Sequence, residues 1–433
     1  MRYLIKIILI ATLSLLFISI YIPLPFGIMS LISLCGLLMS LLRMNKDTMG
    51  IALLLYSGAL MGTLFLILHI QISGYIVSTI LGLLLVKGHI RSFTKQSSIL
   101  IIIIGIFILF FISYLSGPQH AYSNEKITYI LLIGSVAAFA WYINISSFEI
   151  ECEKLALFLA FISCTYLSIS FDYFHFWHPS SILDFDFLRA SWTQLSDYYG
   201  VPYTYHSVGI YAMLAIAYFI GRQKNVKLIT PINAIFFVIC VGLVIISQAR
   251  QAFLGLSLIL LFRIILDAQL SKLKKTVLIV SIVSMAFYGL YNIKSEAFEA
   301  TLTADTSSGF FNRDYKGYEA ESSDRNVMFG TGLGGFSKTG ERLYPHNMLL
   351  ELYIETGWFG LLTLLLLISM NAYRKHLKLN RVTNSSYYIL LPIIGVFVRS
   401  MASSDLTESI SFIVAMVVLI NIKEATKSKL ITQ

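Results

Sequence analysis

Residues Pro345 to Gly360 form the sequence Pro-His-Asn-Met-Leu-Leu-Glu-Leu-Tyr-Ile-Glu-Thr-Gly-Trp-Phe-Gly, which leads from a long polar stretch into an apolar helix. Two acids, Glu351 and Glu355, interrupt the apolar part, and steps of four residues place them with Asn347 on one helical face. A carboxylate at the centre of a membrane helix costs roughly 2.5–3.5 kcal/mol on insertion scales. Two carboxylates just behind His346 therefore indicate a functional site at the start of this helix.

The composition of the whole chain is that of a membrane protein. Hydrophobic residues make up 57% of it and charged residues only 13%, and apolar stretches recur along its length. Because a span needs about 20 apolar residues, we expect an all-α polytopic membrane protein with about 14 (12–14) transmembrane helices in a single transmembrane domain, residues 1–433. The expected spans are roughly residues 4–21, 24–42, 50–70, 72–87, 97–116, 127–147, 154–171, 206–221, 228–247, 251–266, 276–293, 347–370, 385–402 and 408–422.

The basic residues predict the orientation. With the N-terminus inside, most Lys and Arg fall on the inner side and most acids on the outer side, as the positive-inside rule requires. Both termini are then cytoplasmic, and the two longest connections, residues 172–205 and 294–346, are outer loops. The excess of basic residues, a net charge of +9, is explained by this orientation, so it does not indicate a nucleic-acid partner.

Three arginines on the outer side are candidate ligands for an anion. Arg250 lies in a tight turn between two apolar stretches, where the positive-inside rule disfavours it; snorkelling to the membrane surface is the alternative. Arg189 and Arg313 belong to the two long loops, and for Arg189 alone a solvated surface position is the simpler interpretation. The guanidinium group is a rigid fork that binds phosphate oxygens through two hydrogen bonds.

Two further patterns in the outer loops carry weaker signals. Gly330-Thr-Gly-Leu-Gly-Gly335 resembles a phosphate-binding loop but lacks the lysine of such loops, so we interpret it as a turn that lets the backbone approach another group closely. His175 and His178, near Asp172, have a spacing that a metal could use, but no further ligands converge in the sequence. We expect no metal site and no cofactor.

The start of the helix admits two interpretations. His346 can be a helix cap, and Glu355 can be a buried hydrogen-bond partner of a neighbouring helix, for example of Arg399. The combination of His346, Asn347, Glu351 and Glu355 favours a functional role, with Asn347 and Glu351 as candidate substrate-binding residues.

An outer site of this composition suits an anionic, lipid-linked substrate. Two or three guanidinium groups can replace a divalent metal in stabilising a departing diphosphate. Nucleotide sugars are cytoplasmic, so a transferase that faces outward must take its sugar from a carrier lipid.

The same residues resemble the O-antigen polymerase and ligase superfamily of bacterial inner-membrane proteins. The most specific pattern of that family is His-Asn-x-x-Leu-x-x-x-x-Glu-x-Gly-x-x-Gly, and it is met by His346, Asn347, Leu350, Glu355, Gly357 and Gly360. Gly330 to Phe336 is similar to the family's glycine stretch, and Arg313 is similar to its loop arginine. Ser247 to Arg250 resembles the family's Ser-Arg turn, with Ala249 where Ser is common. Arg189 and Gly200 match an Arg-x10-Gly pattern of some polymerases.

The resemblance implies a metal-independent membrane glycosyltransferase that acts on undecaprenyl-diphosphate-linked oligosaccharide at the periplasmic face of the bacterial inner membrane. Arg250 and Arg313 would bind the diphosphate, with Arg189 in the same pocket. His346 would be the general base for the attacking sugar hydroxyl, since an imidazole titrates near neutral pH. Glu355 would orient His346 or the acceptor.

Polymerases and ligases of this family differ in the acceptor. A polymerase transfers the growing glycan to the next lipid-linked repeat, under a chain-length regulator in some systems, whereas a ligase transfers it to lipid A-core. An acid at the position of Glu351 is more typical of polymerases, so we expect an O-antigen or related surface-polysaccharide polymerase, with ligase as the alternative. A lipid-linked oligosaccharide flippase or other transporter is less favoured, because the charges lie near the outer ends of the spans and not at the bilayer midplane.

The Arg250 prediction can be tested by one conservative substitution. Arg250→Lys keeps the charge but removes the fork, so glycan extension should fall by at least about tenfold if the fork contacts a diphosphate. The measurement is the glycan ladder of cells that carry the variant at normal protein level. A fully active lysine variant would indicate that the residue has only a topological role.

Overall fold

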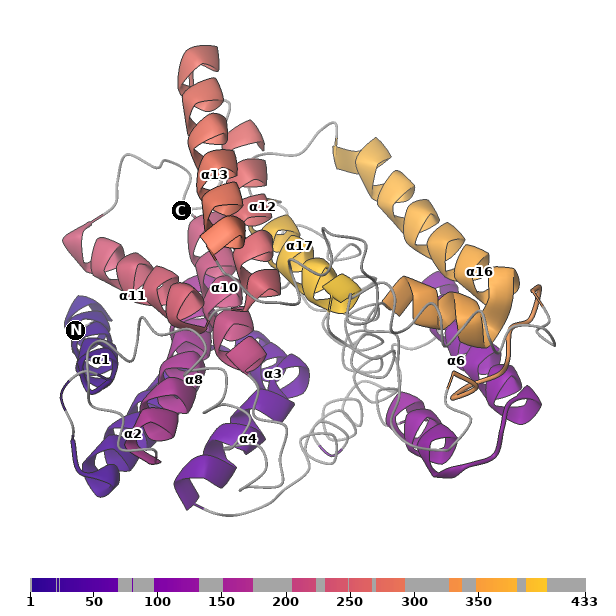
Figure 1. Ribbon diagram of the computed structural model, residues 1–433, viewed down its shortest axis with the longest axis horizontal. Coiled ribbons are helices and arrows are strands. Elements are labelled where there is room, and N and C mark those ends of the chain that lie inside the picture. The colour runs from indigo at the N-terminus through magenta and orange to yellow at the C-terminus, as the bar shows by residue number, and fades with distance from the viewer. Residues whose placement is uncertain are drawn as a thin grey trace, which may run out of the picture. The chain divides into compact units, whose positions relative to one another are not determined.

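A computed structural model of the chain describes residues 2–20, 22, 24–68, 80, 97–131, 151–173, 205–222, 230–247, 249–266, 270–292, 327–336, 348–379 and 387–402. Helices account for 86% of these residues. Figure 1 shows how the helices are labelled along the chain. The chain divides into two compact units.

The first unit comprises Met1–Gly74, Glu149–Ile293 and Thr383–Arg399. Its described helices are α1 (Arg2–Ile18), α2 (Phe26–Leu42), α3 (Lys46–Leu55), α4 (Ser57–Leu68), α8 (Cys152–Tyr173), α10 (Tyr205–Arg222), α11 (Pro231–Ser247), α12 (Arg250–Leu266), α13 (Lys272–Asn292) and most of α17 (Tyr387–Ala402). Helices α8 and α10 pack against each other, with α1, α2 and α4 on α8 and with α11 and α12 on α10. Residues 155–162 of α8 are buried on every side, as expected of a core helix that is apolar all round.

The turn that precedes α12 is fixed by close packing against α10. A Cβ atom on Gly209 would lie 2.4 Å from the Ser247 hydroxyl oxygen and 2.9 Å from the Ala249 Cβ. The Ser247 hydroxyl donates to the Val244 carbonyl at 2.8 Å and accepts from the Ala249 N–H at 3.3 Å. The start of α12 at Arg250 is therefore held against α10 with no room for a larger side chain at Gly209.

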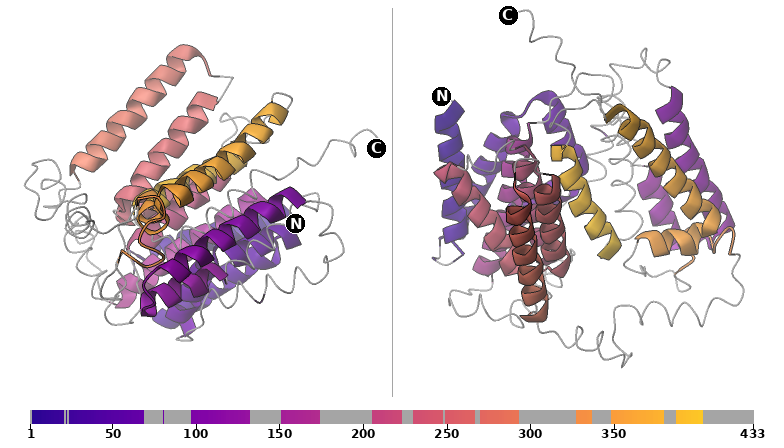
Figure 2. Two further views of the ribbon diagram at one scale, coloured as in Figure 1. Left: turned by 90° about the vertical axis from the view of Figure 1, so that its right-hand side faces the viewer. Right: turned by 90° about the horizontal axis from the view of Figure 1, so that it is seen from above.

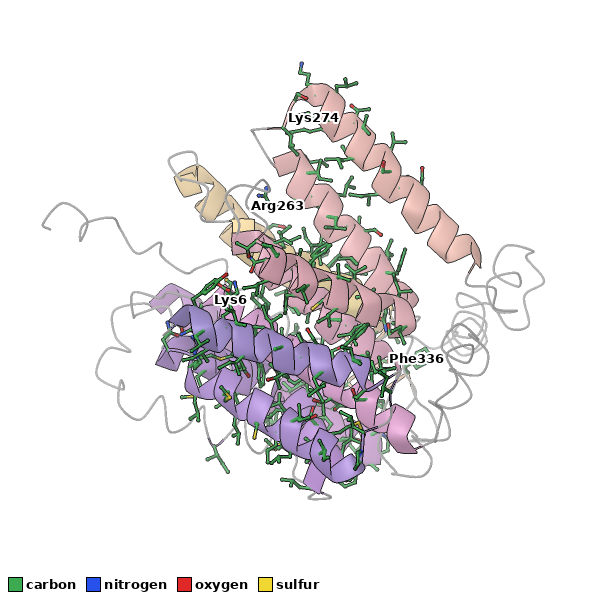
Figure 3. All side chains as sticks on the ribbon, turned by 90° about the vertical axis from the view of Figure 1, so that its left-hand side faces the viewer. Lys6, Arg263, Lys274 and Phe336 are labelled. Atoms are coloured by element: carbon green, nitrogen blue, oxygen red, sulfur yellow. The ribbon has the colours of Figure 1, made fainter. Side chains whose placement is uncertain are left out.

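Polar contacts join three helices of the first unit. Lys6 on α1 donates to the Asn233 side-chain oxygen of α11 at 2.6 Å and forms an ion pair with Glu153 of α8. Lys6 is labelled in Figure 3. The same view labels Arg263 near the end of α12 and Lys274 near the start of α13.

The second unit comprises Tyr75–Phe148, Lys294–Val382 and Ser400–Gln433. Its described parts are α6 (Ser97–Ser116), a helical segment at 121–131, the loop 327–336 and α16 (Met348–Leu379). Helix α6 packs against α16, and Figure 2 shows the two side by side. Helix α16 is broken at Gly357, whose φ of 66° and ψ of −168° are not helical.

The prediction of an all-α polytopic fold with about 14 (12–14) transmembrane helices, cytoplasmic termini and two long periplasmic loops is wrong in its number of spans, although the described residues are mostly helical. Within the described ranges, one stretch, Met348–Leu366, is long and apolar enough to cross a membrane. Seven shorter apolar helical stretches of 10–17 residues are also described, and the longest of these seven spans about 26 Å against a hydrocarbon core of roughly 30 Å. They are Tyr3–Ile18, Phe26–Leu42, Ala59–Leu68, Phe107–Ser116, Ser207–Gly221, Pro231–Ser247 and Gln251–Ile265.

The error has a physical cause in the backbone. Hydropathy counts apolar residues and does not register where a helix ends. The predicted span 50–70 is divided at Tyr56, where φ of −120° and ψ of 18° end α3 one residue before α4 begins. Two predicted spans, 72–87 and 127–147, lie largely outside the described residues, and span 408–422 lies wholly outside them. Of the two long predicted loops, the structure describes only residues 172–173, 205 and 327–336.

Candidate functional site

The structure describes two of the seven predicted site residues in full. Glu351 and Glu355 lie on the first part of α16, both fully buried. For Arg250 the backbone at the start of α12 is described and the side chain is not. The predictions for the other four residues lie outside the described part of the chain; these residues are Arg189, Arg313, His346 and Asn347.

The two acids meet at a lysine. The ammonium nitrogen of Lys126, on segment 121–131, lies 2.5 Å from Glu351 Oε1 and also donates to Glu355 Oε1. All three side chains are 0% exposed. The i, i+4 spacing of the acids brings both carboxylates to one face of α16, where one ammonium with three N–H donors reaches both.

This ion group is stable only as a complete group. Each buried ion loses several kcal/mol of hydration, and the mutual attraction of the charges offsets that loss when the hydrogen bonds are well formed. Burial acts to lower the pKa of Lys126, but the Glu351 and Glu355 carboxylates more than offset this, so its pKa is raised and the ammonium stays charged. The Tyr122 ring adds a cation–π contact, with its centre 4.6 Å from the ammonium nitrogen.

The segment that carries Lys126 is fixed at its start. The His120 Nδ1 atom accepts a hydrogen bond from the Ser123 N–H at 3.1 Å, which caps this short helix. The Ser123 hydroxyl donates to the Pro118 carbonyl oxygen. Ser123 and Lys126 are three residues apart and therefore lie at neighbouring positions on this helix.

The break in α16 is filled by the loop 327–336. In a continuous helix the Ile354 and Glu355 carbonyls would accept from the N–H groups of Trp358 and Phe359. Here these carbonyls accept from the loop instead, Ile354 from the Thr331 N–H at 2.9 Å and Glu355 from the Gly332 N–H at 3.0 Å. In return, the N–H groups of Trp358 and Phe359 donate to the Val327 and Met328 carbonyls at 3.1 and 3.0 Å. Loop and helix thus exchange four backbone hydrogen bonds, an arrangement we call the backbone clasp.

Helix α6 completes the clasp. The Ser113 hydroxyl donates to the Glu355 carbonyl at 3.0 Å, and the Ser113 carbonyl accepts from the Leu333 N–H at 2.9 Å. The backbone of Glu355 is therefore held by the loop and by α6, while its carboxylate is held by Lys126.

Glycine is required at two positions of the clasp. Gly357 has a φ of 66°, and a Cβ there would lie 2.3 Å from the Met328 carbonyl oxygen. Gly332 has a φ of 84°, and its Cβ would lie 2.1 Å from the Gly117 Cα. Residues that carry a Cβ atom rarely adopt such φ values, and neither position has space for a side chain. Gly330, Gly332 and the Gly of Glu-x-Gly thus serve the same contact, whereas Gly334 lies against Ser123.

The loop is a close-approach turn, as its glycines predict, and four of its amides donate to carbonyls within the protein. The N–H groups of Thr331, Gly332 and Leu333 donate to the carbonyls of Ile354, Glu355 and Ser113, and the Gly335 N–H donates to the Gly332 carbonyl. These four donors are used inside the protein.

Lys126 is the residue that sequence reasoning missed. It precedes Glu351 by 225 residues, so no local pattern pairs them. The available signal was indirect: two acids on one face of an apolar helix require a cation, and Lys126 is a basic residue next to an apolar stretch on the predicted outer side. Arg399, the partner suggested from the sequence for Glu355, has no described side chain.

Comparison of the chain with models of protein families and with curated proteins finds no match.

The clasp predicts a large difference between two glycine substitutions. Gly332→Ala should destabilise the protein by about 2–4 kcal/mol, because it combines an unfavourable φ with a clash against α6. Gly105→Ala is the matched control, since nothing lies within 4 Å of a Cβ there and α6 continues through it. The control should be neutral or more stable by up to about 1 kcal/mol.

The measurement is thermal unfolding of the purified full-length protein. Equal melting temperatures for the two variants would contradict the clasp.

Proposed function

We propose that this chain is a membrane glycosyltransferase of the O-antigen polymerase type. It transfers an undecaprenyl-diphosphate-linked glycan onto a lipid-linked repeat unit at the periplasmic face of a bacterial inner membrane. The observation that carries the proposal is the buried Lys126–Glu351–Glu355 group, which fixes the acid of the His-Asn-x7-Glu pattern on the first part of α16.

Burial of the two acids supports a chemical role for this end of α16. Charged groups that are fully buried are costly, and they are retained where a reaction needs a fixed charge. Glu355 follows Asn347 by eight residues, about 12 Å along a helix. The acid pair therefore belongs to the same short stretch of chain as the proposed base His346.

The proposed reaction is a displacement at the anomeric carbon of the donor sugar. The acceptor hydroxyl forms the new C–O bond while the bond to the diphosphate breaks, and undecaprenyl diphosphate leaves with the bonding electron pair. His346 takes the proton of the hydroxyl. Arg250, Arg313 and Arg189 stabilise the charge that develops on the diphosphate, and this supplies the electrostatic role that a metal has elsewhere. Glu355 orients His346 or the acceptor.

Exposed apolar faces support a location in lipid. Three helices of the first unit, α1, α2 and α11, carry large apolar side chains on their outer sides, among them Leu31 at 63%, Leu42 at 79% and Val238 at 65% exposure. Monomeric proteins in water rarely expose apolar faces of this extent. A lipid-linked donor would approach such a surface from within the same bilayer.

The proposed base is tested by His346→Ala. The variant should abolish glycan extension at normal protein level, because it removes the imidazole that takes the hydroxyl proton in the proposed reaction. Glu355→Gln should lower extension strongly, whereas Glu125→Gln should leave it unchanged, since Glu125 is a half-buried acid outside the ion group. Normal glycan ladders for His346→Ala would remove the base assignment.

Deletion of the gene separates the two acceptors. Loss of all long chains with one repeat still attached to lipid A-core indicates a polymerase. A bare core with lipid-linked polymer accumulating indicates a ligase. An unchanged surface glycan would contradict both.

A further inference from the structure

We propose that Lys126 is a positioning residue of the reaction centre, whose ammonium holds the carboxylate of Glu355 in place with the carboxylate of Glu351 as its second anchor. This inference rests on the proposed function, because it takes Glu355 to act beside His346. It assigns a role to a residue far from both arginine-bearing loops and from α16 in the sequence.

The contacts of Lys126 differ from those of an ordinary surface ion pair. Its ammonium binds two carboxylates at once, Glu351 and Glu355, and none of the three side chains is exposed. Two other lysines of the described residues pair with acids, Lys6 with Glu153 and Lys154 with Glu151, and all four of these side chains are at least 20% exposed. Exposed pairs of that kind contribute little, and a fully buried group depends on each member.

Glu355 is held at its backbone and at its carboxylate, and Lys126 holds the carboxylate. Its carbonyl accepts from the Gly332 N–H and the Ser113 hydroxyl, both at 3.0 Å, so its backbone cannot move without breaking the clasp. The freedom that remains is in the side-chain torsions. The ammonium of Lys126 removes that freedom and also opposes the repulsion between two carboxylates one turn apart.

A fixed carboxylate matters for the reaction proposed above. An acid that orients a base or an acceptor must stay ionised and in one place. Without the ammonium, one of the two acids takes up a proton or turns away, and Glu355 no longer offers a fixed acceptor. A displacement of about 1 Å in such a group can lower a rate about 100-fold.

Two charge-swapped double variants separate positioning from a purely structural role. Lys126→Glu with Glu351→Lys and Lys126→Glu with Glu355→Lys both keep one ammonium and two carboxylates in the group. In the first, position 355 keeps its carboxylate; in the second it receives the ammonium. Both swaps should melt at higher temperature than Lys126→Met, and only the first should recover glycan extension.

Kinetics of the purified full-length protein with lipid-linked oligosaccharide give the second readout. Lys126→Met should lower kcat about 100-fold and leave KM for the donor within about twofold, because the lost interaction serves the transition state. Lys126→Arg should retain part of the activity, since it keeps the charge. Lys154→Met is the control and should stay near the wild-type rate.

Full activity of Lys126→Met, or equal recovery by both swaps, would overturn the proposal. If Lys126→Met does not fold, the two swaps and Lys126→Arg decide, because each keeps a cation in the group. If the wild-type protein extends no glycan, the proposed function fails, and the order of melting temperatures then reports on the ion group alone.

Discussion

One ammonium shared by two buried carboxylates is the constraint on which the second unit depends. Lys126, Glu351 and Glu355 have no exposed surface, so their charges must be balanced within the protein. This requirement fixes segment 121–131 against the first part of α16. The clasp then fixes the other side of the same stretch, because α16 gives up two of its own hydrogen bonds at Gly357 and replaces them with bonds to the loop 327–336. Electrostatics and backbone hydrogen bonding thus act on the same few residues.

The break in α16 explains why the glycines lie where they do. A helix interrupted at Gly357 leaves two carbonyls, on the buried residues Ile354 and Glu355, and two N–H groups without their helical partners. Buried polar groups that stay unpaired are costly. The loop supplies all four partners, but only if its backbone comes closer to α16 and α6 than a side chain would allow. The glycines at 330 and 332 and the glycine at 357 are two halves of one contact, although they are separated by more than 20 residues in the chain.

Local features of the site were predictable from the sequence, and long-range ones were not. The helix that starts near 348, the shared face of Glu351 and Glu355, and the close approach of the glycine loop follow from periodicity and residue type. The pairing with Lys126 and the register of the clasp do not, because both join segments distant along the chain. The predicted number of membrane spans was wrong, and in the span 50–70 the reason is that hydropathy measures composition, whereas the break at Tyr56 depends on backbone geometry. Arg250, Arg313, Arg189, Asn347 and His346 remain predictions for the proposed reaction.

The most direct test of the account is the stability of a triple variant. Lys126→Met alone leaves two buried carboxylates without their cation and should cost about 3–5 kcal/mol of unfolding free energy. Adding Glu351→Gln and Glu355→Gln removes both charges, so the triple variant should be more stable than Lys126→Met by at least about 2 kcal/mol. The measurement is equilibrium or thermal unfolding of the full-length protein. A triple variant that is less stable than Lys126→Met would show that the three residues contribute independently, and it would contradict a shared ion group.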